Sequence, residues 1–180
     1  MRFYVLGLLA LAALAACSKP ATHAAATNVV EKITVTITPP APPPAAVAVS
    51  GIYVMNGKAA ALTEATAHKG DAFFDKPIID LVLTEKSQAG SSQPATDAIF
   101  GNFGNALVAH IEEDGTVTGV ELVHSGRKDA QGSISVAGPI KMEDFKSEGG
   151  QISGRLTTDG PMDLFDNKLN INVIFRAKWP

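Results

Sequence analysis

The sequence predicts an all-β domain, either an antiparallel up-and-down barrel or a two-sheet sandwich of about eight or nine strands. Short runs rich in Val, Ile, Leu and Phe recur from Gly51 to the C-terminus and alternate apolar with polar residues, as half-buried antiparallel strands do. Turns that contain Gly separate these runs, and no long helical pattern follows the first apolar run. The order of hairpins along the chain favours an up-and-down arrangement, and both architectures remain open.

The first apolar run is typical of a signal peptide. Arg2 precedes an uncharged run from Val5 to Leu14, which is shorter than the roughly 20 residues of a membrane-spanning helix. The run ends in Leu14-Ala15-Ala16-Cys17. This tetrapeptide resembles the lipobox of bacterial lipoproteins, Leu-small-small-Cys. The resemblance implies cleavage before Cys17, a diacylglycerol thioether on its sulfur, and acylation of the new amino terminus.

Ser18 follows the cysteine where Asp is the alternative, and this is similar to the outer-membrane sorting pattern of such lipoproteins. The resemblance thus implies a protein anchored in the outer membrane through lipidated Cys17 and facing the periplasm. An ordinary signal peptide that ends in a chance cysteine is the alternative. We divide the chain into a signal peptide (1–16), a lipidated tether (17–50) and a β domain (51–180).

The tether is rich in Ala, Thr and Pro and contains the run Pro39-Pro40-Ala41-Pro42-Pro43-Pro44. Proline fixes φ and lacks an N–H, so this segment is expected to be an extended, semi-rigid spacer. A ligand for an aromatic groove is the alternative role of such a run. Within the tether, Ile33–Thr38 alternates apolar and β-branched polar residues, which predicts a strand that could dock on the domain.

The composition argues against nucleic acid as a partner and against disulfide bonds as a source of stability. The net charge is −3, and loss of Arg2 with the signal peptide leaves 14 basic and 18 acidic residues, a net charge of −4. This acidity argues against nucleic acid as a partner. Cys17 is the single cysteine, so no disulfide can form and the β domain must be stabilised by its apolar core.

Alternation and turn residues predict eight or nine strands in the domain and one short helical turn, and the Ala-rich strand at 58–63 has a second helical turn as its alternative. Asn56-Gly57 suits a type I′ hairpin turn. The turn at Asp97–Phe103 would be capped by Thr96 or Asp97. The predicted strands are 52–55, 58–63, 78–84, 105–112, 116–124, 133–138, 140–146, 151–158 and 169–179.

The pattern also predicts which residues face the core and how two hairpins pair. Inward residues are Ile79, Leu81 and Leu83, then Ile134 and Val136, and alternate residues from Leu169 to Trp179. A turn at Asp114-Gly115 places Leu107 opposite Leu122, Ala109 opposite Val120 and Ile111 opposite Thr118. A three-residue loop at Glu148-Gly149-Gly150 places Met142 opposite Leu156 and Glu143 opposite Arg155.

No catalytic, cofactor or metal site is expected from the residues. His23 lies in the tether and His68 in a predicted loop, while His110 points outward and His124 inward, so these two cannot share an ion. Ser125 follows His124 directly, but neighbours in a strand point to opposite faces, so His124 cannot act as a base on the Ser125 hydroxyl. Asp159, Asp163 and Asp166 lack the spacing of a calcium-binding loop and are expected to form turns. Glu112-Glu113-Asp114 is expected to be a solvated turn, and Gly101–Gly104 a turn rather than a phosphate-binding loop. The sequence has no Gly-x-Ser-x-Gly motif of the kind that carries a nucleophilic serine.

The function that these observations favour is a non-catalytic binding or structural lipoprotein with a periplasmic protein partner. A more specific version is an immunity protein or inhibitor that blocks a toxin acting in the periplasm. Two alternatives are an envelope-acting hydrolase that uses cross-strand carboxylates such as Asp163 and Asp166, and a carrier of a small apolar ligand inside an open barrel.

Overall fold

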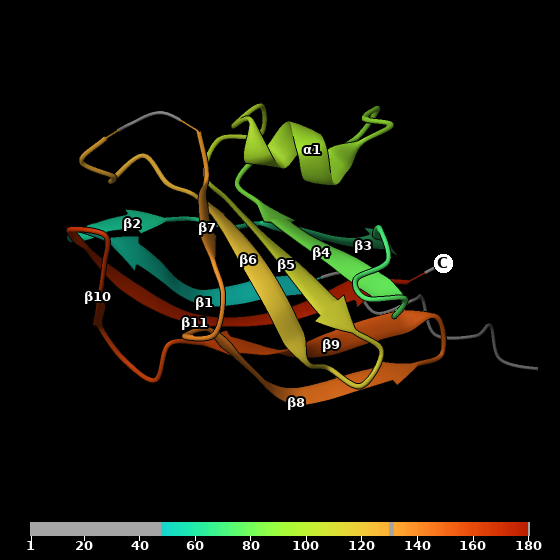
Figure 1. Cartoon of the computed structure of the whole chain (residues 1–180). Helices are drawn as coiled ribbons and strands as arrows, with labels where there is room; N and C mark the ends of the chain where they lie inside the picture. The colour runs from blue at the N-terminus through green and yellow to red at the C-terminus, as the bar shows by residue number, and fades with distance from the viewer. Residues whose placement is uncertain (1–47, 130–131, 180) are drawn as a thin grey trace, which may run out of the picture. The chain divides into compact units, whose positions relative to one another are not determined.

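A computed structural model describes residues 48–129 and 132–179. These residues form eleven strands and one short helix (Figure 1). The elements are β1 (Ala48–Met55), β2 (Lys58–Ala60), β3 (Glu64–Lys69), β4 (Ile78–Thr84), α1 (Pro94–Ile99), β5 (Ala106–Glu112), β6 (Val117–Val123), β7 (Ile134–Val136), β8 (Lys141–Glu148), β9 (Gln151–Thr157), β10 (Met162–Leu164) and β11 (Asn167–Lys178). Cys17 and the strand expected at Ile33–Thr38 lie outside the described residues.

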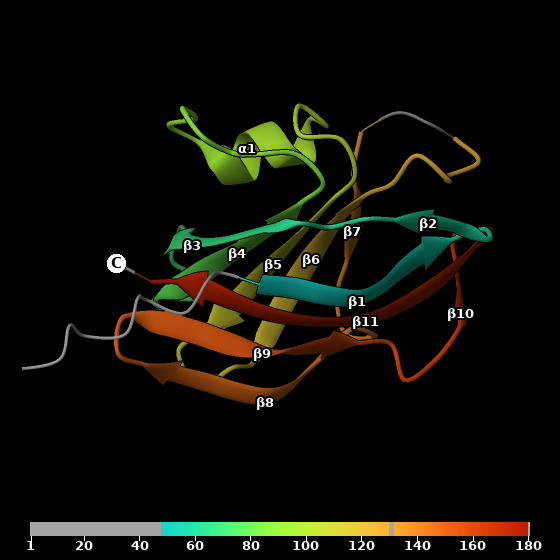
Figure 2. The ribbon, with the colours of Figure 1, turned by 180° about the vertical axis from the view of Figure 1, so that it is seen from behind.

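The strands make a sandwich of two layers, and the described residues do not close it into a barrel (Figures 1 and 2). The hydrogen-bonded order is β2-β1-β11-β3-β4-β5-β6-β7, with β9 and β10 also on β11 and β8 on β9. The first layer contains β2, β1, β11, β10, β9 and β8, and the second contains β3 to β7. The layers join where Lys178 of β11 pairs in parallel with Thr66 of β3. The second layer is the expected run of sequential antiparallel hairpins.

The core fills the space between the two layers. Alternation along β11 predicts its inner face correctly, since buried and less buried residues alternate from Asn167 to Lys178. The inward residues of β4 and β7 are also those expected. Large core side chains that are at most 1% exposed include Leu81, Leu107, Leu122, Leu156, Ile171 and Phe175. Burial of these apolar surfaces is the main source of stability.

A second, smaller apolar cluster lies on the outer face of the second layer, where α1 covers it (Figure 1). It contains Val82, Ala98, Ala106 and Val108. The helical turn predicted at 97–103 begins three residues earlier in the structure, at Pro94. The prediction relied on a side-chain cap at Thr96 or Asp97, whereas the helix starts with a proline in its first turn and has no side-chain cap at Gln93. Proline suits this position because its fixed φ is already helical and its missing N–H is not needed there.

Two strands were not expected from the sequence, β3 and β10. The inward residues of β3 are Ala65 and Ala67, which have weak strand preference. The segment is a strand because β4 pairs along its whole length. His68 therefore lies in a strand, where the sequence had indicated a loop. β1 begins at Ala48, so residues 48–50, which we assigned to the tether, belong to the sheet.

Two β-bulges account for the errors in the predicted registers. Leu107 pairs with Leu122 and Ala109 with Val120, as predicted, but the register shifts after His110 and Ile111 pairs with Val117 rather than Thr118.

Likewise, Met142 pairs with Leu156 and Glu143 with Arg155, as predicted. The register then shifts before Lys146, so Glu148 pairs with Gln151 across a two-residue Gly149-Gly150 turn, not a three-residue loop. In this second hairpin the extra residue thus sits in the strand rather than in the turn. In the first hairpin Thr118 is the extra residue of β6, and the turn holds three residues, Glu113 to Gly115, rather than two.

One glycine is required where β1 pairs with β11. Gly51 has a φ of 116°, and a Cβ there would lie 2.0 Å from the carbonyl oxygen of Asn172. A side chain at this position would force apart the two central strands of the first layer.

Candidate functional site

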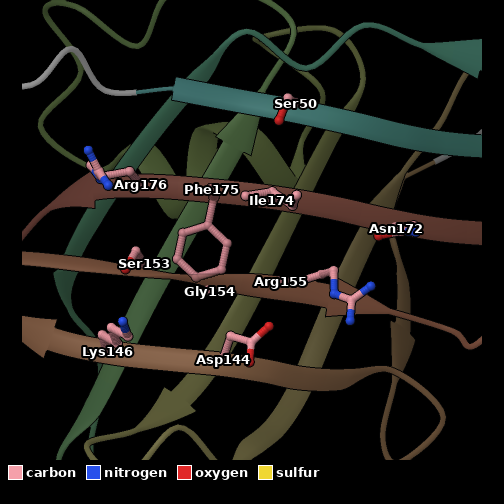
Figure 3. A pocket seen from close by; sticks show the side chains of 10 residues that line it. All are labelled: Ser50, Asp144, Lys146, Ser153, Gly154, Arg155, Asn172, Ile174, Phe175 and Arg176. Carbon is pink, nitrogen blue, oxygen red and sulfur yellow. The ribbon is translucent and has the colours of Figure 1, made fainter.

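The outer face of the first layer carries a hollow of about 660 Å³. We call it the outer-face groove (Figure 3). Its lining residues come from β1, β8, β9 and β11: Ser50, Asp144, Lys146, Ser153, Gly154, Arg155, Asn172, Ile174, Phe175 and Arg176. Ile174 in the groove is 55% exposed and Ile52 beside it is 44% exposed. This face therefore presents apolar surface to solvent among polar and charged groups.

Two cations without a carboxylate partner among the described residues lie in this groove. Ser153 pairs with Lys146 of β8 on one side and with Arg176 of β11 on the other. Figure 3 shows Lys146 and Arg176 on opposite sides of Ser153. The third cation, Arg155, forms an ion pair with Glu143. The row Lys146–Ser153–Arg176 thus offers two positive charges and a hydroxyl group, which suit a carboxylate or phosphate.

The bulge in β8 is what puts Lys146 in the groove. The predicted register, if continued, would place Lys146 opposite Ile152, which is fully buried. Instead Asp144 adopts a φ of 53° and the register shifts, so that Phe145 packs on the core and Lys146 faces outward. The sequence carried one signal for this: Met142 and Phe145 are both apolar but three residues apart, so a regular strand would point them to opposite faces.

A second polar group lies on the outer face of the second layer, beside α1. Asp80 of β4 pairs with His68 of β3 on one side and His110 of β5 on the other. The Nδ1 atom of His110 lies 2.8 Å from the Asp80 carboxylate, and this hydrogen bond raises the pKa of His110. Desolvation lowers the pKa of His68. The row is therefore a histidine–carboxylate pair with a second, less basic imidazole.

The hydroxyl group closest to this row is not activated as a nucleophile. Nε2 of Gln88 donates to the carbonyl oxygen of Val82, so its Oε1 accepts from Thr66 at 2.6 Å. Because the Thr66 proton is used in that bond, Nε2 of His68, 2.8 Å away, must itself donate to the Thr66 oxygen. His68 therefore cannot remove the Thr66 proton in this arrangement, as a general base would.

The third histidine of the described residues, His124, lies apart from this row. His110 points outward as expected, while His124 is 3% exposed and packs edge-on against the Tyr53 ring with centroids 4.6 Å apart. Burial lowers the pKa of His124 and raises that of Tyr53. The side-chain oxygen of Asn105 accepts a hydrogen bond from the backbone N–H of Ser125. His23 lies outside the described residues.

The carboxylates singled out in the sequence occupy turns or surface ion pairs. Asp163 pairs with Lys168 and Asp159 with Lys141. Asp166 has a left-handed φ in the β10–β11 turn, and Glu112 pairs with Lys76 at 2.6 Å. The backbone N–H of Thr116 bonds to Asp114 and lowers the pKa of that carboxyl. In 48–129 and 132–179, no three metal-ligating side chains converge.

The same described ranges contain no helix that is long and apolar enough to span a bilayer. Comparison with known proteins adds no relative: no family model, no curated protein sequence and no solved structure matches this chain.

Proposed function

We propose that this chain is a lipid-anchored extracytoplasmic protein whose β domain binds a periplasmic partner without catalysis. The anchor is Cys17, acylated in the outer membrane, and the binding surface is the outer-face groove. The lipobox-like tetrapeptide supports the anchor, and more than one acyl chain makes such an anchor stable.

The observation that carries the proposal is the row Lys146–Ser153–Arg176 next to exposed Ile174. Two unpaired cations about two strand spacings apart, roughly 10 Å, can each bind a carboxylate, and an arginine can do so through two hydrogen bonds. Apolar area beside them supplies affinity when it is covered. The groove therefore suits an acidic segment of a protein partner that also carries apolar side chains.

The proton arrangement around Thr66 supports binding rather than catalysis. Its hydroxyl donates to Gln88, and His68 is a donor to it, so Thr66 is not an activated nucleophile in this state. Of the two carboxylates that the hydrolase alternative would use, Asp163 forms an ion pair with Lys168 and Asp166 lies in the β10–β11 turn. The carrier alternative requires an open interior, whereas core side chains fill the space between the layers.

The groove is tested by reversing its charges in the mature, anchored protein. Lys146→Glu combined with Arg176→Glu is expected to abolish cross-linking of the protein to its partner in envelope preparations. Lys86→Glu, an exposed lysine in the loop before α1, is the matched control and should leave cross-linking intact. The same cross-linked band in both variants would contradict the groove as the binding surface.

The anchor is tested separately by Cys17→Ala and membrane fractionation. The variant should move from the membrane to the soluble fraction, and continued sedimentation with membranes would contradict lipid attachment.

The immunity or inhibitor version is tested by deleting the gene and challenging the cells with toxin-secreting siblings. Survival equal to that of the parent strain would exclude it.

A further inference from the structure

The hairpin between β3 and β4 ends in two exposed aromatic side chains, Phe73 and Phe74, which we call the aromatic tip. They are 49% and 85% exposed. Their rings contact each other edge-on, with centroids 4.5 Å apart. The pair therefore forms one apolar knob rather than two scattered surface residues.

The backbone holds this knob in a turn that phenylalanine does not favour. Phe73 and Lys76 exchange two backbone hydrogen bonds of 3.0 Å, and both residues between them have left-handed φ, 47° at Phe74 and 61° at Asp75. Type I′ turns of this kind prefer Asn-Gly, as at β1–β2 of the same domain. Phe74 is therefore kept at the tip of the turn at a conformational cost, as is Phe165 in the β10–β11 turn.

The aromatic tip lies at the end of the sandwich where the chain enters the domain. Ala48, the first residue of β1, pairs with Arg176 near the end of β11. β3 runs parallel to β11 beside that end, with Lys178 opposite Thr66, and then leads into the tip (Figures 1 and 2). Residues 18–47 span at most about 100 Å, so an anchor at Cys17 keeps the domain within reach of the bilayer, and this end is the one that the tether enters.

The aromatic tip has no excess of positive charge. The hairpin carries two lysines, Lys69 and Lys76, and two aspartates, Asp71 and Asp75, and Lys76 pairs with a further carboxylate, Glu112 of β5, so the tip has no net attraction to anionic surfaces. Aromatic side chains nevertheless concentrate at membrane interfaces, where the ring leaves water. An anchored domain needs only weak affinity to make such a contact, because the tether sets a high effective concentration.

We propose that the aromatic tip inserts into the lipid interface and is a second, reversible membrane contact that orients the domain. This inference rests on the proposed lipid anchor. It assigns the membrane to one end of the sandwich and leaves the outer-face groove open to the periplasm. Because the contact is apolar, it should not depend on salt or on the fraction of anionic lipid.

The β10–β11 turn provides a matched control. Phe165 is 71% exposed and has a φ of 43°, and the next residue is again an aspartate with a φ of 61°. This Phe-Asp turn has the same backbone geometry as the aromatic tip but lies at the other end of β11. A change made in both turns therefore compares two locations with the same backbone geometry, and Leu164 takes the place of Phe73 in the control turn.

The test uses the full-length lipidated protein in vesicles of phosphatidylethanolamine and phosphatidylglycerol that contain lipids with brominated acyl chains. Phe74→Trp and Phe165→Trp are compared in a Trp179→Phe background, which removes the single natural tryptophan. The brominated lipids should quench the tryptophan fluorescence of Phe74→Trp and not that of Phe165→Trp, and the result should be the same at high salt. If Trp179→Phe unfolds the domain, Phe74→Cys and Phe165→Cys with a polarity-sensitive dye serve instead.

Sedimentation with the vesicles reports on the anchor independently. If both variants sediment but Phe74→Trp is quenched no more than Phe165→Trp, the aromatic tip is not the end that contacts lipid and the inference is overturned, while the proposed anchor stands; a protein partner for the tip would leave both unquenched. If neither variant sediments, the anchor is wrong and the inference that depends on it is overturned.

Discussion

Replacement of Gly51 by alanine tests whether the close approach of β1 and β11 determines the first layer. The new methyl group would lie 2.0 Å from the Asn172 oxygen and 3.1 Å from Cα of Val173. Both contacts are with backbone atoms of β11, which is paired on both edges. No side-chain rotation can relieve them, so β1 itself would have to shift.

The expected loss in the free energy of unfolding of Gly51→Ala has two parts. A φ of 116° is unfavourable for any residue with a Cβ, at a cost of about 1–3 kcal/mol. Forcing atoms into a packed region costs about 1–3 kcal/mol more. Their sum, about 2–6 kcal/mol, is a large part of the roughly 5–15 kcal/mol that stabilises a typical domain, and we expect Tm to fall by about 10–20 °C.

Gly160→Ala separates the two parts. Gly160 has a φ of 113°, and nothing lies within 4 Å of a Cβ built there, so this variant should lose only the conformational part. Urea unfolding followed by Trp179 fluorescence measures both variants. If Gly51→Ala and Gly160→Ala lose equal stability, within about 0.5 kcal/mol, the close approach is not a constraint and this reasoning is refuted.

Two further outcomes follow from the hydrogen bond at His110 and from the core. Because Asp80 raises the pKa of His110 above its unfolded value, the ion pair contributes fully below about pH 6.5 and is lost as pH rises through the folded pKa. Asp80→Asn should therefore lower Tm more at about pH 5.5 than at about pH 8, and an equal loss at both would contradict this assignment. Leu107→Ala, at a site that is 0% exposed, should cost about 2–5 kcal/mol in urea unfolding. Ile174→Ala, at a site that is 55% exposed, should stay within about 0.5 kcal/mol, and a larger loss would show that this face is covered.

Local sequence patterns determined much of the fold. The fold class, the limits of β4, the Asn56-Gly57 turn and the inner face of β11 all follow from alternation or from turn residues. These features depend on neighbours within a few positions, because successive side chains in a strand point to opposite faces. Pairing of Leu107 with Leu122 was predictable as well, since a short hairpin carries its partners close together in sequence.

Only the tertiary structure decided which residues form the candidate sites. The bulge at Asp144 turns Lys146 from the core face to the groove, and Arg176 joins it across β9, although the two residues lie 30 positions apart in the sequence. The strand β3 and its parallel contact with β11 bring the aromatic tip to the end of the sandwich where the chain enters. Such features arise from the balance of packing against partners that are distant in sequence, and no local alternation of side chains encodes that balance.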